Sequence, residues 1–288
     1  MKFLLSVLFV LLCTSLPAQE ADKVDKSDES SKQDRLRGSI GEARSWWDLQ
    51  HYHLSLQVFP DEKRIAGSNV ITFKTLKSEK RMQIDLQQPL EITKVIYSGK
   101  ELKIDREGNV YWLTFENPLT ADKQHKIEVF YEGVPTVSKR PPWEGGFTWK
   151  KDKNGKPQIC TTCQGIGASI WWPNKDHGAD EPDNGMAISV TVPQDLVAVA
   201  NGRLNKQDHD TAAKTKTYHW VVTQPINNYC VNVNIADYVS FEDKYDGEFG
   251  KLDISYWVFR GDRERAEKQF KEAPRTIKAF EHLSLIHI

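Results

Sequence analysis

The chain has 288 residues, of which 39% are hydrophobic and 27% are charged, and its formal net charge is −1 at pH 7. This composition is ordinary for a folded globular protein with a sizeable core, in one large or two ordinary domains. The balanced charge excludes the basic surface that nucleic acids or acidic membranes attract, so we expect no nucleic-acid partner.

Residues 1–18 predict a signal peptide. A lysine near the start precedes an apolar run from Phe3 to Cys13, and Ala18 precedes the expected cleavage site. The apolar run is too short for a stable membrane-spanning helix. We therefore expect an exported protein, periplasmic or extracellular, with no membrane span after cleavage. Attachment of a lipid at Cys13 is disfavoured by Leu12, which stands where a small residue is expected, and the sequence leaves open whether the protein is free or lipid-anchored.

Residues 19–45 are polar and rich in charge, with few apolar side chains over their first half. A segment of this kind buries too little apolar surface to offset its loss of conformational entropy. We predict that residues 19–45 form a disordered linker.

Residues 46–260 predict an all-β domain. His51–Val58 alternates polar and apolar residues, which places Tyr52, Leu54 and Leu56 on one face of a half-buried strand. Many further short strands, separated by turn residues, indicate a multi-sheet β-sandwich. These strands are expected at residues 65–73, 82–86, 92–97, 110–115, 127–131, 147–150, 158–163, 187–192, 196–200, 217–222, 230–235 and 252–259.

Two local signals refine this pattern. Asn154-Gly155 favours a hairpin turn between two of the strands, because both residue types tolerate positive φ. Near Asp262, a plausible helix N-cap, the apolar period changes to that of a helix, and Pro274 should kink or split that helix. We expect the first helix of a second, helical domain over residues 261–282.

The cysteines are predicted to form neither a zinc site nor a disulfide framework. Cys160 and Cys163 would point to opposite faces of a strand, and no second cysteine pair exists to complete a zinc site. Three cysteines remain after removal of the signal peptide when Cys230 is included, and an odd number argues against a disulfide framework. We predict that Cys160 and Cys163 are half-buried, unpaired strand cysteines.

Two clusters of polar side chains are candidate metal sites. His51 and His53 share one face of a strand, but the sequence places no third ligand beside them, so a solvated face is favoured. Four acidic residues gather in one loop without the regular ligand spacing of a calcium loop, so a solvated loop is favoured over a calcium site. They are Asp176, Asp180, Glu181 and Asp183.

Familiar catalytic motifs are missing from the sequence. There is no HExxH, and His282 and His287 are five residues apart, which misses the spacing of two ligands on one helix face. There is also no GxSxG and no phosphate-binding loop. We predict neither a catalytic residue nor a metal ligand in this chain. Trp171 and Trp172 are predicted to pack in the core rather than to form a sugar-binding platform.

The combination of these segments resembles a known family. The residues that carry the resemblance are PPWEGGFTWKKDKNGKPQICTTCQGIGASIWWPNKDHGADEPDNGMAISVTVPQDLVAVANGRL, with HYHLSLQV, RIAGSNVITF and MQIDL before them and NNYCVNVNIADYV after them. They are similar to the N-terminal domain of the zinc aminopeptidases that include aminopeptidase N and leukotriene hydrolase, and most similar to the exported bacterial branch. The resemblance extends from Trp46 to His282.

The resemblance implies a saddle of β-sheets that packs against a thermolysin-like catalytic domain. In this family, HExxH and a downstream Glu bind zinc, and the substrate is a peptide with a free N-terminus. One Gln or Glu of the N-terminal domain binds the free α-amino group of the substrate, and the motif places Gln164 in that role. A carboxamide oxygen is suited to it because it accepts a hydrogen bond from an ammonium group.

The resemblance also implies that most of the active site is missing from this sequence. The zinc ligands and the GxMEN segment would belong to a catalytic domain in cis, of which residues 261–282 are the start. Residues 283–288, LSLIHI, depart from the family and are expected to be a non-native tail. We therefore expect an N-terminal fragment that is inactive alone. The alternative is a stand-alone secreted β-sandwich module that binds carbohydrate or protein.

Overall fold

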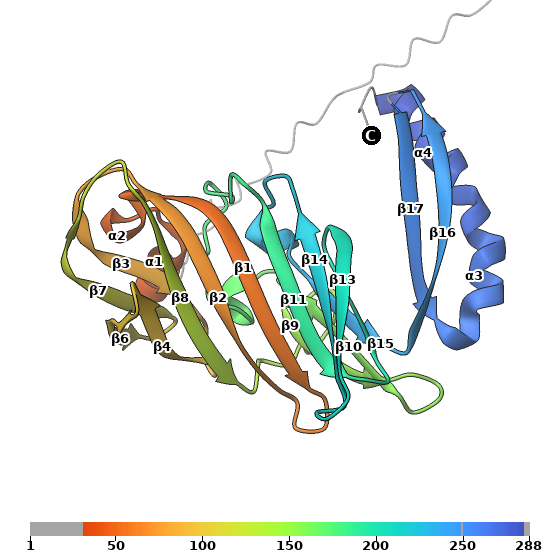
Figure 1. The fold of residues 1–288 in the computed structure, drawn as a ribbon, viewed down its shortest axis with the longest axis horizontal. Coiled ribbons are helices and arrows are strands. Elements are labelled where there is room, and N and C mark those ends of the chain that lie inside the picture. Colours follow the sequence, from red (N-terminus) through yellow and green to blue (C-terminus); the bar gives the residue numbers. More distant parts are fainter. Residues whose placement is uncertain (1–30, 249, 285–288) are drawn as a thin grey trace, which may run out of the picture.

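The structure is a computed structural model that describes residues 31–248 and 250–284. The predicted signal peptide, the first part of the predicted linker and residues 285–288 lie outside the described residues. Four β-sheets dominate the chain, and the longest of the described helices follows the last strand (Figure 1). The all-β, multi-sheet class predicted from the sequence is confirmed.

The largest sheet is built around β1 (Trp47–Phe59), which pairs antiparallel with β2 and parallel with β11. Tyr52, Leu54 and Leu56 of β1 are buried, while the residues between them are half-buried or exposed, as the alternating pattern predicted. The order of the eight strands is β13 (Arg203–Asp210), β14 (Thr215–Val222), β11 (Met186–Pro193), β1, β2 (Arg64–Thr75), β8 (Gln124–Gly133), β4 (Glu91–Tyr97) and β5 (Lys100–Glu101).

Two smaller sheets share a hydrophobic core with the large one. One contains β3 (Glu79–Asp85), β7 (Val110–Leu119) and β6 (Lys103–Glu107), and the other β12 (Val197–Ala200), β15 (Val233–Ala236), β10 (Pro157–Thr162) and β9 (Gly146–Lys151). Trp220 of β14 donates from Nε1 to the Ala198 carbonyl of β12 at 3.1 Å, so β12 lies on the core side of the large sheet. Trp46, Trp171 and Trp172 fill this core.

The strands predicted from alternation are all present, with small shifts at their ends. The predicted Asn154-Gly155 hairpin joins β9 to β10, and Gly155 has a positive φ of 77°. The strand expected at residues 230–235 begins later, because Asn228–Cys230 forms a 3₁₀ turn. Four strands were not predicted, namely β5, β6, β13 and β16.

The predicted disorder of residues 19–45 differs from the structure over residues 31–45. Two short helices occupy this segment, α1 (Lys32–Gly38) and α2 (Glu42–Ser45). Ser31 and Asp34 close a capping box at the start of α1, and the Arg44 side chain of α2 is fully buried. The prediction of disorder rested on average composition. Composition does not reveal a capping pair such as Ser31 and Asp34, or a buried charge such as Arg44 that has a partner.

The C-terminal part forms a separate ribbon with helices along it (Figure 1). Strands β16 (Tyr238–Gly247) and β17 (Gly250–Phe259) pair only with each other among the described strands. The helices that follow are η4 (Arg260–Asp262), α3 (Arg263–Gln269), η5 (Phe270–Glu272) and α4 (Ala273–Ser284).

The predicted interruption at Pro274 is confirmed, since α4 begins one residue before it. Asp262 holds the predicted N-cap position of α3 but makes no side-chain cap, and its φ of −115° and ψ of 6° differ from the extended backbone of a capping residue. Its carboxylate accepts from Lys153 Nζ at 3.0 Å. Within the described residues, no helix has the length and apolar character needed to cross a membrane.

Candidate functional site

Gln164 lies in an exposed turn directly after β10. The amides of Ile166 and Gly167 both donate to the Cys163 carbonyl, at 3.2 and 3.0 Å, which closes the turn. The Gln164 carbonyl accepts from the Gly145 amide at 2.9 Å. The backbone of Gln164 is therefore fixed, while the residue itself is exposed to solvent.

A carboxylate orders the far side of this turn. Asp176 accepts from the amides of Ala168 and Ser169, at 3.2 and 3.1 Å, and from Ser169 Oγ at 2.6 Å. Gly167 has a positive φ of 83°, and a Cβ at this position would lie 2.4 Å from Asp176 Oδ2. A glycine is required here both for the backbone conformation and for the approach of the carboxylate.

Tyr229 forms a hydrogen bond with the side chain of Gln164. Its hydroxyl donates to Gln164 Oε1, and 48% of the Tyr229 residue surface is exposed. The 3₁₀ turn that carries Tyr229 is anchored by Asn228, which is buried and donates from Nδ2 to the Lys175 carbonyl at 2.6 Å. Nothing in the sequence pointed to this pair, because the two residues lie on different elements of the four-stranded sheet region.

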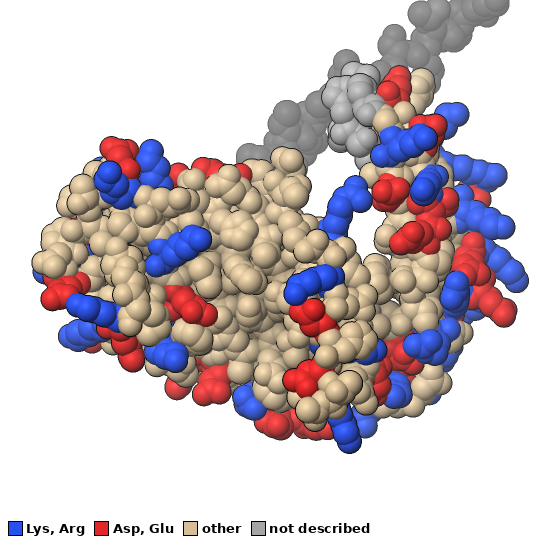
Figure 2. Space-filling view, viewed as in Figure 1, with Lys and Arg blue, Asp and Glu red and all other residues tan. Residues whose placement is uncertain are grey.

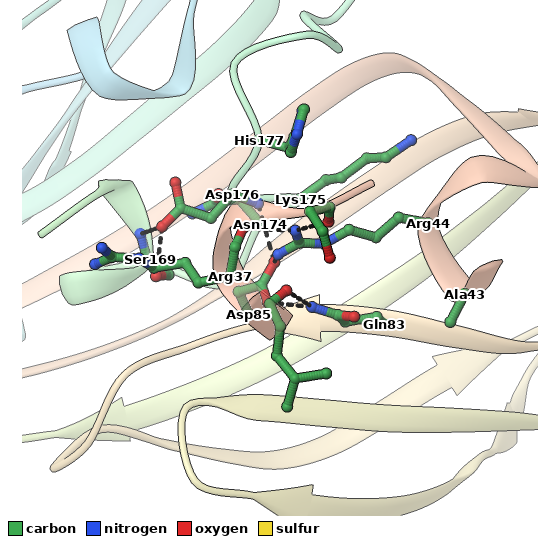
Figure 3. A network of polar contacts seen from close by, with 12 residues as sticks. Arg37, Ala43, Arg44, Gln83, Asp85, Ser169, Asn174, Lys175, Asp176 and His177 are labelled. Atoms are coloured by element: carbon green, nitrogen blue, oxygen red, sulfur yellow. Dashed lines mark hydrogen bonds and ion pairs between the residues drawn. The ribbon is translucent and has the colours of Figure 1, made fainter. Parts of the chain in front are cut away.

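A buried ion pair supports the loop behind the site (Figure 3). Arg44 donates from Nη2 to Asp85 Oδ2, and both side chains are almost inaccessible to solvent. Arg44 Nη1 donates to the carbonyls of Arg37 and Ser39, at 2.7 and 2.8 Å. The Asp176 amide donates to the same Asp85 oxygen at 3.0 Å. Burial raises the pKa of the Asp85 carboxyl, and the Arg44 guanidinium opposes that rise.

A second buried charge lies one residue before Asp176. Lys175 donates from Nζ to Asp180 Oδ2 and, at 2.7 Å, to the Trp47 carbonyl, and its ammonium lies 4.0 Å from the centre of the Trp47 ring. Burial lowers the pKa of Lys175, and the Asp180 carboxylate opposes that change. Tyr52 Oη accepts from the Lys175 amide at 3.0 Å.

The acidic loop differs from the solvated loop predicted from the sequence. Asp180 pairs with Lys175, Glu181 accepts from Asn227 Nδ2 at 3.1 Å, and Asp183 accepts from Gln50 Nε2 at 2.8 Å. Together with Asp176, each of the four carboxylates has a donor supplied by the protein. The loop is a structural network, because long-range contacts with β1 and the Asn227 turn supply partners that the spacing alone does not reveal.

The remaining sequence predictions at this site have clear outcomes. Trp171 and Trp172 are completely buried, which confirms that they pack in the core. Cys160, Cys163 and Cys230 are unpaired, and Cys160 is half-buried as predicted. Cys163 differs from the prediction, because it follows the end of β10 and is buried, while Cys230 is exposed. Burial raises the pKa of the Cys163 thiol to about 12. Within residues 31–248 and 250–284, no group of three or more His, Cys, Asp and Glu side chains is arranged to hold a metal ion.

The fold is found in solved zinc peptidases. The M1 zinc metallopeptidase from Deinococcus radiodurans has a TM-score of 0.63 at 20% identity, with 75% of this chain and 48% of that chain covered. A mutant of the same enzyme bound to a Tyr-Ser-Ala substrate has a TM-score of 0.64 at 19% identity, with 78% and 50% covered. This chain thus spans about half the length of these structures. A search of curated proteins finds no match.

The sheets and the ordered turn after β10 therefore belong to the class of N-terminal domains found in M1 zinc metallopeptidases. The model of the peptidase M1 N-terminal domain matches residues 49–230, more than half of the chain. The chain belongs to this family, and the predicted resemblance to the aminopeptidase N family is confirmed.

Proposed function

We propose that this chain is the N-terminal domain of an exported zinc metallo-aminopeptidase, and that Gln164 binds the free α-amino group of the peptide substrate. The observation that carries the proposal is the family match over residues 49–230 together with the exposed carboxamide of Gln164 at the end of an ordered turn. The Tyr229 hydroxyl occupies one lone pair of Gln164 Oε1. A carbonyl oxygen has a second lone pair, which is available to a substrate ammonium.

Zinc would not be held by the residues described here, since they offer no cluster of three or more ligating side chains. We assign no catalytic step to this chain. The proposal places the metal and the water-activating groups in a catalytic domain in cis, of which residues 261–282 are the start, and places peptides with a free N-terminus as substrates. It includes export and removal of residues 1–18, and a non-native origin for residues 283–288.

The proposal predicts that the 288-residue chain alone is inactive. Zinc and an aminoacyl-arylamide added to the purified chain should give no release of arylamine above background. Turnover by this chain would overturn the assignment of the catalytic groups to another domain. The genomic sequence downstream of codon 282 gives an independent test, because an in-frame HExxH is expected there.

The role of Gln164 is tested in the complete enzyme encoded by that gene. Gln164→Ala should raise KM for aminoacyl-arylamides at least tenfold, because one ligand of the ammonium is lost, while Gln164→Glu should retain binding. Gln158→Ala, on β10 before the turn, is the matched control and should leave KM unchanged. Equal KM values for wild type and Gln164→Ala would exclude this residue as the amine ligand.

A further inference from the structure

The turn that carries Tyr229 has an ordered backbone and an exposed phenol. The Tyr229 amide donates to Asn227 Oδ1 at 3.0 Å, and Asn227 donates from Nδ2 to Glu181 Oε1 at 3.1 Å. The Cys230 amide donates to the Asn227 carbonyl at 2.9 Å, and the Cys230 carbonyl accepts from Asn201 Nδ2 at 3.0 Å. Nevertheless, 48% of Tyr229 is exposed. A fixed backbone reduces the conformational entropy that this residue loses when it binds a ligand.

The Tyr229 hydroxyl retains the capacity to accept hydrogen bonds. A phenol oxygen donates one proton and accepts through its lone pairs. The proton is donated to Gln164 Oε1, and this is the only hydrogen bond of the hydroxyl within the described residues. Donation polarises the phenol oxygen, which makes it a stronger acceptor. Two oxygens therefore lie side by side, and each can accept a hydrogen bond from a ligand.

An ammonium group is a ligand that requires several neighbouring oxygens. It has three N–H donors and no acceptor, and a donor left unpaired after the loss of water is costly. The formal net charge of the chain is only −1, and basic and acidic side chains are interspersed on the face shown in Figure 2. No broad acidic surface attracts a cation on that face. Recognition of an ammonium group then depends on individual oxygens that lie close together.

We propose that the Tyr229 hydroxyl is a second ligand of the α-ammonium group of the substrate, beside Gln164. This inference rests on the proposed function and deepens it by adding an amine-binding residue. Hydrogen bonds from an ammonium nitrogen to oxygen are about 2.7–2.9 Å long. Because Tyr229 Oη and Gln164 Oε1 are themselves hydrogen-bonded, one nitrogen can lie at this distance from both. Tyr229 keeps the proton that it donates to Gln164, so no proton is transferred.

The test measures the contribution of the amino group to binding in the complete enzyme. Leucine hydroxamate and 4-methylpentanohydroxamate differ only in the α-amino group, so their inhibition constants isolate it. Tyr229→Phe should weaken inhibition by leucine hydroxamate by about tenfold or more, because a hydrogen bond to a charged group is lost. Inhibition by the amine-free compound should be unchanged. Tyr97→Phe, which removes a hydroxyl 2.9 Å from His125 Nδ1 in the large sheet, is the control and should change neither constant.

A double variant separates direct binding of the amine from positioning of Gln164. If Tyr229 binds the amine itself, adding Tyr229→Phe to Gln164→Ala should weaken inhibition by leucine hydroxamate by about a further threefold or more. If Tyr229 only holds the Gln164 carboxamide in place, the second substitution has no further effect. That result would overturn the proposal.

The outcomes distinguish this proposal from the proposed function. Amine-dependent loss in Gln164→Ala with wild-type constants in Tyr229→Phe overturns the role of Tyr229 alone. Wild-type constants in both variants, or no inhibition of the wild-type enzyme, overturn both assignments. Equal weakening of the two hydroxamates by Tyr229→Phe also overturns the role of Tyr229, because it indicates a loss of structure rather than the loss of an amine ligand.

Discussion

At the scale of single residues, the buried charges around the acidic loop are the most informative feature. Arg44 and Asp85 are both almost fully buried and paired, and Lys175 and Asp180 form a second pair nearby. Removing a charge from water is costly unless a partner and further hydrogen bonds compensate. Here the carbonyls of Arg37 and Ser39 and the Asp176 amide supply those bonds. The pairs thus fix the position of the loop behind Gln164.

Arg44→Met should destabilise the chain by about 3–5 kcal/mol, because Asp85 is left buried without its partner. The free energy of unfolding is measured by urea titration. The double variant Arg44→Met/Asp85→Leu should recover part of this loss, since neither charge remains. Arg275→Met, in an exposed pair with Glu272, is the control and should have little effect. A double variant no more stable than Arg44→Met would contradict the argument.

Cys163 and Cys230 should differ in reactivity. Burial keeps the Cys163 thiol protonated and covered, with its pKa raised to about 12, whereas Cys230 is exposed. Iodoacetamide at pH 8 should modify Cys230 quickly and Cys163 only after addition of urea. Peptide mass spectrometry measures the labelling of both cysteines in the same sample. Rapid labelling of Cys163 in the native chain would contradict the burial of its thiol.

At the scale of elements, hydrogen bonds from β16 and the residue after it hold α4 in its orientation. The Tyr245 hydroxyl of β16 donates to Glu281 Oε2 of α4, and the Glu248 amide donates to Glu281 Oε1 at 3.3 Å. Glu281 is 8% exposed although α4 carries the exposed side chains of Phe280 and Leu283. The orientation of α4 along the ribbon therefore depends on this carboxylate.

Tyr245→Phe should loosen α4 and lower the urea midpoint monitored by helical circular dichroism. The hydrogen bond to Glu281 raises the pKa of Tyr245 to about 12. A raised pKa stabilises the fold below the unfolded value of about 10, and this contribution is lost as the pH rises through about 12. The difference between wild type and variant should be smaller at pH 11 than at pH 8. The control for loss of a hydroxyl is Tyr256→Phe at pH 8, because the Tyr256 hydroxyl makes only a contact of 3.5 Å with the Phe270 carbonyl. A Tyr245→Phe difference that is independent of pH would exclude the proposed linkage.

At the scale of the whole molecule, the chain divides into a thick body of three sheets and a thin ribbon. The body shares one core, whereas every residue of β16 and β17 is half-buried or exposed. The ribbon meets the body at a few places, among them the Trp220 and Trp257 rings, whose centres are 5.8 Å apart. Isolated two-stranded ribbons are marginally stable in water.

Amide hydrogen exchange should therefore be uneven across the chain. Amides of β16 and β17 should exchange at least tenfold faster than those of β1, β2 and β11, because they open without disrupting the shared core. Mass spectrometry of peptides from the labelled chain measures both groups together. Equal protection of the ribbon and the large sheet would show that the chain unfolds as one cooperative unit.

The sequence allowed the strands to be predicted where one face is buried and the other solvated. β1 was found in this way, while β13 and β16 were missed because both carry many charged side chains and little buried surface. At the site, the family motif identified Gln164, but not the Tyr229 hydroxyl beside it or the partners of the acidic loop. These partners come from distant segments, and no local pattern encodes them.

The sequence alone determined the buried face of β1, because alternation along a strand is a local property. It also determined the family, through the segment around Trp171 and Trp172. Only the tertiary structure decided that β1 pairs in parallel with β11, that Arg44 and Lys175 are buried, and that the Tyr229 hydroxyl bonds Gln164. Such features depend on which segments pack together, and the free energy of a buried charge is set by neighbours that the chain brings near only when it folds.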